Sequence, residues 1–184
     1  MSDIQDEIDL MRRTARGDAA AFRTLADAHL KKIMGFAYRL LNDRTEAEDV
    51  AQETFLRLWK QAGRYEPKAR VSTWLHCIAH NLCVDRLRAR REQSSDGLDE
   101  ESASQEPGGL LDRKLAAGAV RNALAALPER QRAAITLVHY QELSNIEAAE
   151  VLGIGVEALE SLLARGRRTL REKLAEPQLQ GGRS

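Results

Sequence analysis

The chain has 184 residues, enough for one domain or two small ones, and carries 28 Lys and Arg against 28 Asp and Glu. A formal net charge of zero excludes a protein that binds polyanions through its overall charge, so any nucleic-acid surface must come from segregated charge. The charge is segregated: acids gather in residues 3–9, 43–53 and 92–112, and bases in residues 86–91 and 165–173.

The sequence carries no sign of a membrane protein. It has no apolar run long enough to span a bilayer, and the N-terminal MSDIQDEIDL contains no hydrophobic signal segment. We therefore expect a cytoplasmic protein without membrane insertion.

The only cysteines, Cys77 and Cys83, lie in one predicted helix about 9 Å apart along its axis, which excludes a disulfide while the helix holds. With His76 and His80 they offer ligand types that zinc takes. The two thiols, however, point about 120° apart, and no second ligand pair follows. We expect no metal and no cofactor; whether the thiols respond to oxidants stays open.

Residues 5–16 and 18–42 are predicted to form two helices broken near Gly17, with Asp18 as the N-cap of the second. Their apolar stripe is more typical of a core than of a cofactor site and comprises Phe22, Leu25, Ala26, Leu30, Ile33, Met34, Ala37, Leu40 and Leu41. A turn at Asn42 and Asp43 follows. Thr45 and Glu48 then have the spacing of a capping box for the next helix.

The next predicted helix has the sequence AEDVAQETFLRLWKQA. Its side chains expected to pack inward are Val50, Phe55, Leu56 and Trp59, and those expected to face outward are Glu48, Asp49, Gln52, Glu53, Arg57 and Lys60. Such a pattern usually indicates a face exposed to solvent. An acidic, amide-rich face on a well-packed helix could equally be a protein docking surface.

Residues 64–91 join a basic loop containing Pro67 to a helix that we expect to begin at about Ser72, a good N-cap. The predicted buried face comprises Leu75, Ile78, Ala79 and Leu82, and the side chains pointing largely away from it are His76, Cys77, His80, Asn81, Val84 and Arg88. Arginines concentrate at the end of the helix, where they suit the helix dipole or contact with phosphate. From the residues alone, both interpretations stay open.

After the arginines, the segment EQSSDGLDEESASQEPGG has the composition of a linker. A helix is predicted over about residues 111–127, stopped by Pro128, and another begins in PERQRAAITLVHYQ with the proline near its first position. Its expected apolar set is Ala133, Ile135, Leu137 and Val138.

The last segment has the spacing of a helix-turn-helix: Ser144 caps NIEAAEVLG, GIG makes a tight turn, and VEALESLLARGRRTLREKL is the second helix. On that helix Val156, Leu159, Leu163 and Leu170 are expected to face inward, and Glu157, Ser161, Arg165, Arg168 and Glu172 outward. A plain helical hairpin with a basic end is the alternative. The alanine pair, the turn glycine and the arginines favour DNA binding.

Three stretches in this order, AEDVAQETFLRLWKQ, STWLHCIAHNLCVDRLRARR and LPERQRAAITLVHYQELSNIEAAEVLGIGVEALESLLARGRRTLREKL, resemble the extracytoplasmic-function (ECF) sigma factors of bacterial RNA polymerase. The resemblance covers nearly the whole chain. It implies an all-α protein with a region 2 helical bundle over residues 10–92, a flexible acidic linker over residues 93–112 and a region 4 helix-turn-helix over residues 113–176.

The resemblance also implies partners and site residues. The partners are core RNA polymerase, through its β′ clamp and β flap, promoter DNA and an anti-sigma factor; no small-molecule substrate is expected. Asp49, Gln52, Glu53, Leu56 and Trp59 match the core-polymerase-binding helix. The −10 element would be melted and read by Arg64, Lys68, Arg70, Trp74, His80, Asn81, Arg86, Arg88 and Arg90, and the −35 element by Ser144, Glu157, Ser161, Arg165 and Arg168.

Within the −10 set, Asn81 and Asp85 match an N-L-x-x-D pattern; Asn81 can donate to and accept from a base edge, whereas Asp85 would brace the fold. Trp74 could stack on a flipped base or belong to the core. Family members often carry basic residues where this chain has Glu160 and Leu162, so its −35 preference is expected to be unusual.

The resemblance therefore predicts a dissociable promoter-specificity subunit that directs transcription initiation of a stress-response regulon. It is not expected to be an enzyme. The competing interpretation is a stand-alone helix-turn-helix regulator, which would have no need of residues 44–91. An enzyme is disfavoured because no phosphate loop, nucleophile elbow or zinc-protease motif occurs in the sequence.

Overall fold

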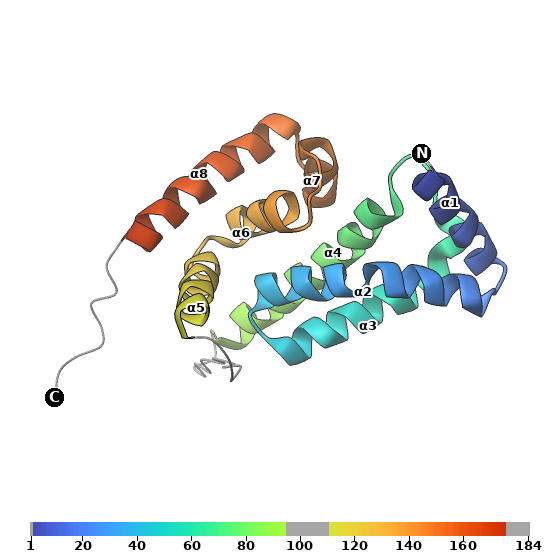
Figure 1. The fold of residues 1–184 in the computed structure, drawn as a ribbon, viewed down its shortest axis with the longest axis horizontal. Coiled ribbons are helices and arrows are strands. Elements are labelled where there is room, and N and C mark those ends of the chain that lie inside the picture. The colour runs from blue at the N-terminus through green and yellow to red at the C-terminus, as the bar shows by residue number, and fades with distance from the viewer. Residues whose placement is uncertain (1, 95–110, 176–184) are drawn as a thin grey trace.

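The computed structural model describes residues 2–94 and 111–175, and every element within these ranges is helical, which confirms the predicted all-α class (Figure 1). The helices are α1 (Ser2–Ala15), α2 (Ala19–Leu41), α3 (Arg44–Gln61), the short 3-10 helix η1 (Ala62–Arg64), α4 (Val71–Ser94), α5 (Leu111–Ala125), α6 (Glu129–Ile135), the π turn η2 (Thr136–Tyr140), α7 (Asn145–Leu152) and α8 (Val156–Ala175). Apart from its ends, the predicted acidic linker lies outside the described residues.

The N-terminal half is a bundle in which α2 packs on α1, α3 and α4 (Figure 1). Asp18 caps α2 as expected, because its carboxylate accepts hydrogen bonds from the N–H groups of Ala20 and Ala21 at 2.9 and 3.1 Å. At its other end, Asn42 adopts a left-handed conformation (φ 52°) and closes the helix by donating its N–H to the Tyr38 carbonyl.

Two predicted caps in this half are wrong. The N-cap of α3 is Asp43, whose side chain accepts from the Glu46 N–H at 2.9 Å, so Thr45 lies inside the first turn. The fourth helix begins at Val71, with Ser72 as its second residue; the Ser72 carbonyl accepts from the His76 ring at 2.7 Å. In both places the chain enters its helix one or two residues earlier than the cap pattern indicates.

The C-terminal half is a helical unit in which α8 packs on α6, α7 and α5. Ser144 caps α7 in a full capping box with Glu147, and Gly153 (φ 62°) makes the turn into α8. Pro128 is the N-cap of α6, one position before its expected place. Gly166 lets α8 approach α6 closely, because a Cβ there would lie 3.0 Å from Ile135 Cγ1.

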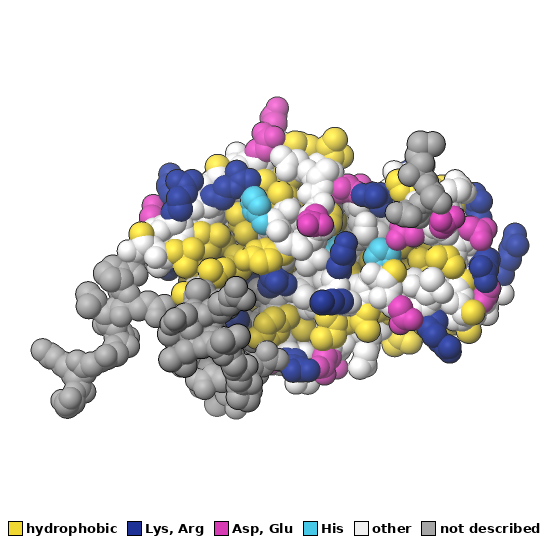
Figure 2. Space-filling model, viewed as in Figure 1, with side chains coloured by type: hydrophobic (Ala, Val, Ile, Leu, Met, Phe, Trp, Pro, Cys, Tyr) yellow, Lys and Arg dark blue, Asp and Glu magenta, His cyan; other side chains and the backbone are white. Residues whose placement is uncertain are grey.

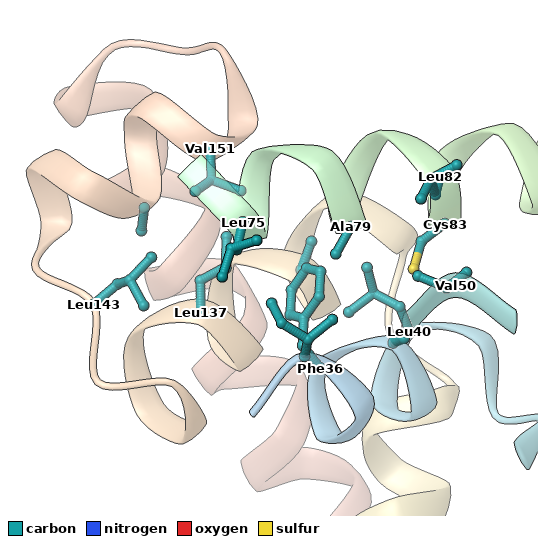
Figure 3. Packing of buried hydrophobic residues seen from close by; sticks show 14 of the residues in the cluster. Phe36, Leu40, Val50, Leu75, Ala79, Leu82, Cys83, Leu137, Leu143 and Val151 are labelled. Atoms are coloured by element: carbon teal, nitrogen blue, oxygen red, sulfur yellow. The ribbon is translucent and has the colours of Figure 1, made fainter. Parts of the chain in front are cut away.

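One hydrophobic core runs through both halves (Figure 3). Phe36 and Leu40 of α2, with Leu75 and Ala79 of α4, form its centre, and Leu137, Leu143 and Val151 continue it into the C-terminal half. Helix α4 packs on α7 of the C-terminal half as well as on α2 and α3, so the two halves pack together along α4.

Several predicted burial assignments are wrong. Leu30, Leu56, Trp59 and Val156 were expected to face inward but are 44%, 51%, 39% and 37% exposed. His76 was expected to point outward but is 1% exposed, and its ring packs edge-on against Phe36 of α2 with centroids 5.3 Å apart. Among the described residues, no helix combines the length and hydropathy needed to cross a membrane.

Candidate nucleic-acid interface

The outer face of α3 presents an apolar patch within charged surroundings. Leu56 is half-exposed beside Trp59, whose ring packs edge-on against Phe22 with centroids 5.2 Å apart. Gln52 is exposed, and Glu53 accepts a hydrogen bond from Arg57 at 2.8 Å. The helix lies along the edge of the molecule away from α6 to α8 (Figure 1). The patch is therefore open to a large partner.

Asp49, the remaining member of the predicted docking set, is more than half exposed and lies 3.8 Å from Arg86 of α4. This separation is at the outer limit of an ion pair, and exposed pairs contribute little to stability. The pair connects the acidic end of the α3 face with the basic end of α4.

The loop before α4 is organised by two aromatic rings. The Tyr65 hydroxyl donates to the Ala69 carbonyl at 2.7 Å, and its ring meets Trp74 edge-on at 5.8 Å between centroids. Around them, Arg64, Lys68 and Arg70 are exposed. Lys68 pairs with Glu66 at 2.6 Å. The loop thus presents cations around a half-buried Trp74.

The open face of α4 carries Asn81, Asp85 and Arg88, all exposed. Arg88 donates to Asp85 at 3.2 Å on the surface. The sequence had suggested that Asp85 braces the fold. In the structure its hydrogen bond is instead to Arg88 of the same helix. Asn81, one turn earlier, presents an amide able to donate and accept.

Arg90 lies apart from that open face. Its guanidinium donates to both carboxylate oxygens of Glu46, at 3.3 and 2.6 Å, and to the Leu41 carbonyl at 3.0 Å. A cation at the C-terminus of α2 also matches the helix dipole. Arg90 thus connects α4 to the junction of α2 and α3, a structural role that was not predicted from the sequence.

The C-terminal half covers the flank of α4 that carries His76 and His80. Burial lowers the pKa of both imidazoles below the ordinary value, and the nearby Arg130 lowers that of His80 further. Within the described parts of the chain, His76 Nε2 and His80 Nδ1 make no hydrogen bond of good geometry, although the side chains of Gln141 and Asn81 lie near the two rings. His80 is thus held beside α6, whereas its neighbour Asn81 faces solvent.

Both cysteine thiols are held protonated. Burial raises the pKa of Cys77 to about 11 and that of Cys83 to about 12. Neither has the exposed, electropositive surroundings of a reactive thiol. Within residues 2–94 and 111–175, no three His, Cys, Asp or Glu side chains are placed to hold a metal ion.

The helix-turn-helix places the predicted −35 residues at two distances from the turn. Glu157 and Ser161 are exposed near the start of α8, and Arg165 and Arg168 are exposed further along. The hydroxyl and N–H of Ser144 both donate to Glu147 Oε2, at 2.8 and 2.9 Å, so this serine is engaged in its cap.

The structure joins the basic loop directly to the helix-turn-helix. Glu147 of α7 accepts from the Thr73 hydroxyl at 3.3 Å and lies 4.0 Å from Arg70. Partial burial alone would raise the pKa of Glu147, but the hydrogen bonds from Ser144 and Thr73 and the charge of Arg70 hold it below the ordinary value. The predicted −10 and −35 residues thus meet at this one carboxylate.

Two family models match the chain: Sigma-70 region 2 over residues 25–93 and Sigma-70, region 4, over residues 117–170. The ECF RNA polymerase sigma factor SigW of Bacillus subtilis is 32% identical over 180 residues, covering 90% of this chain and 95% of the relative. The ECF RNA polymerase sigma factor SigL of Mycobacterium tuberculosis is 35% identical over 169 residues, covering 88% and 93%.

Solved structures give the same result. The sigma factor RpoE, in complex with the anti-sigma factor NepR from Bartonella quintana, is 30% identical with a TM-score of 0.73, covering 85% of this chain and 98% of that one. CnrH, in complex with the cytosolic domain of CnrY, is 26% identical with a TM-score of 0.74, covering 94% and 99%. The likeness extends over both halves of the fold.

Proposed function

Since this chain belongs to the ECF sigma factors of bacterial RNA polymerase, we propose that its three surfaces divide the work of promoter recognition. The outer face of α3 docks on the β′ clamp of the core enzyme. The loop at residues 64–70 and the open face of α4 melt and read the −10 element, and the helix-turn-helix reads the −35 element and contacts the β flap. On this account the protein acts in the cytoplasm as a regulatory subunit, not as an enzyme.

The observation that carries the docking assignment is the exposure of Leu56 and Trp59 on α3. A protein that binds DNA alone has no use for an apolar patch on a helix remote from its helix-turn-helix. Aromatic and aliphatic side chains within a charged rim are typical of the centre of a protein interface.

The −10 assignment rests on the positive charge around the loop at residues 64–70. Strand opening needs no covalent chemistry. Strand opening requires cations that hold the backbone and a site that captures an unstacked base. Arg64, Lys68 and Arg70 supply charge beside the aromatic pair of Tyr65 and Trp74, and Asn81 offers a base-edge contact. Because Arg90 is bound to Glu46 and Leu41, its part in this account is to hold α4 in place.

Both structural relatives are bound to a second protein, in one case named as an anti-sigma factor. We propose that an anti-sigma factor also restrains this chain, by placing a helix in the apolar cavity of about 450 Å³ between α2, α5 and η2. Its lining includes Tyr38, Val120 and Leu124 together with Arg39 and Arg121. Those residues fit a helix with apolar side chains and a carboxylate.

The docking assignment is tested by measuring the affinity of the purified protein for core polymerase. Leu56→Asp should weaken binding at least ~10-fold, because it places a charge at the centre of the interface. Leu30→Asp is the matched control, since Leu30 is a similarly exposed leucine on α2. Equal loss in both variants, or in neither, would overturn the assignment.

The proposed binding of an anti-sigma factor is tested by measuring how strongly an anti-sigma factor that inhibits the wild-type protein inhibits transcription by a variant. Val120→Glu should relieve that inhibition while leaving transcription without the inhibitor unchanged. Persistent inhibition of this variant would place the inhibitor elsewhere.

A further inference from the structure

The second helix of the helix-turn-helix has halves of opposite charge. In its first half the exposed side chains are Val156, Glu157, Ala158, Glu160, Ser161 and Ala164, and those residues include no Lys or Arg. In its second half Arg165, Arg167, Arg168 and Arg171 are exposed. In Figure 2, acidic side chains project where α8 begins beside α7, and Lys and Arg side chains gather further along the helix.

The buried face of α8 fixes which of these side chains point outward. Leu159, Leu163 and Gly166 are buried, and the glycine lies against Ile135 of α6. At 100° per residue, Glu157 and Ser161 lie opposite that face, and Glu160 lies on its flank. In a helix-turn-helix, the N-terminal residues of the second helix contact base edges in the major groove. The two carboxylates therefore occupy base-reading positions.

Neither carboxylate is used within the protein. Across the described parts of the chain, no hydrogen bond or ion pair involves Glu157 or Glu160, whereas Glu53 is bonded to Arg57 and Glu129 to Arg91. An acid with an internal partner can serve the fold. These two acids have no such partner and are available to an external donor.

The hydrogen-bonding capacity of a carboxylate determines which nucleobases it can contact. An ionised carboxylate only accepts hydrogen bonds, and in the major groove the exocyclic amino groups of cytosine and adenine are donors. Guanine presents N7 and O6, both acceptors, at the same edge. A carboxylate facing guanine is left unpaired and is also repelled by the nearby phosphates.

We propose that Glu157 and Glu160 are specificity-determining residues that select cytosine or adenine, through their exocyclic amino groups, at the part of the −35 element facing the start of α8. The arginines from Arg165 onward hold the adjacent backbone. This inference rests on the proposed function, because it takes α8 as the helix that reads the −35 element.

The test uses full-length protein assembled with core polymerase on promoters that share one −10 element and carry a randomised −35 element, with transcripts counted by sequencing. Read on one and the same strand, the wild type should favour cytosine or adenine over guanine and thymine by about 10-fold at one or more positions. Glu157→Ala and Glu160→Ala should each abolish the preference at one position and raise transcription from mismatched templates.

The matched control is Glu172→Ala, an exposed acid at the other end of the same helix, which should leave the base preference unchanged. Melting temperatures equal to the wild type would show that each variant is folded. If Glu157→Ala and Glu160→Ala both kept the wild-type base preference at every position, this inference would be overturned and the proposed function would stand. Absence of promoter-dependent transcript, or indifference to the whole −35 element, would instead overturn the proposed function, and this inference with it.

Discussion

Asn81 lies exposed on the open face of α4, one helical turn before Asp85 and Arg88. A substitution at this position can therefore test DNA recognition without changing the surface proposed to dock on the core polymerase. Asn81→Ala removes an amide that can bond a base edge and leaves α3 untouched, so we expect promoter opening to fall while affinity for core polymerase is kept. Permanganate footprinting of melted thymines and a core-binding titration measure the two quantities. Equal loss of both would count against the −10 assignment.

The cysteines give a second residue-scale prediction, since burial holds the pKa of Cys77 at about 11 and that of Cys83 at about 12. The thiolate is the reacting species, and a rise of two units from the ordinary value of 9.0 leaves ~100-fold less of it at neutral pH. A thiol reagent should therefore modify the native protein at least ~100-fold more slowly than the urea-unfolded chain. Comparable rates would reopen an oxidant-sensing role.

At the scale of the element, the end of α2 is held by arginines from both halves. Arg90 of α4 bonds the Leu41 carbonyl at 3.0 Å, and Arg132 of α6 bonds the Leu40 carbonyl at 2.9 Å. Each places a cation at the C-terminus of the helix, where the dipole is favourable. Such contacts join elements far apart in the sequence.

We expect Arg90→Ala to lower the free energy of unfolding by about 1–2 kcal/mol, because it removes hydrogen bonds to a half-buried carboxylate and a carbonyl. Arg88→Ala is the control: Arg88 is 68% exposed and, among the described residues, is bonded only to the exposed Asp85, so its loss should cost less than about 0.5 kcal/mol. Urea titrations compare the two variants. If they proved equally stable, Arg90 would be free for DNA.

Local sequence signals predicted the helices well and their starts less well. Asp18 and Ser144 were found as caps because each directly precedes its helix with the expected spacing. Thr45 and Ser72 were wrongly predicted as caps, because Asp43 caps α3 and because α4 begins at Val71, before Ser72. A cap pattern cannot rank two neighbouring candidates.

In the molecule as a whole, the two halves pack together along α4. The helical periodicity of the hydrophobic residues could not predict this packing. The helical wheel placed His76 outward because it allows α4 a single buried face. In the structure Leu137 and Val151 of the C-terminal half belong to the same core as Leu75 and Ala79 of α4 (Figure 3). The buried His76 ring packs edge-on against Phe36 of α2, with centroids 5.3 Å apart. A wheel identifies one apolar face, whereas α4 has partners on two.

This packing predicts a pH dependence. Burial lowers the pKa of His76 and His80; the charged or titratable groups nearby are His29 and Lys32 for His76 and Arg130 for His80, and all oppose protonation. A depressed histidine pKa contributes stability above the unfolded value of about 6.5 that is lost as the pH falls below it. The free energy of unfolding should therefore decrease from about pH 7.5 to 5.5.

Urea titrations across that range measure the effect, and His76→Gln should flatten the slope because its side chain does not titrate. A slope that is absent in the wild type, or unchanged in the variant, would show that the flank of α4 carrying His76 is open in solution.

As an ECF sigma factor, this chain gives bacterial core polymerase its choice of promoter. The most direct measurement is run-off transcription by purified core enzyme, with and without the protein, on a library of candidate promoters. We predict transcripts that depend on the protein and share two spaced sequence elements. No transcript, combined with no binding to core polymerase, would contradict the account and favour a regulator that binds DNA alone.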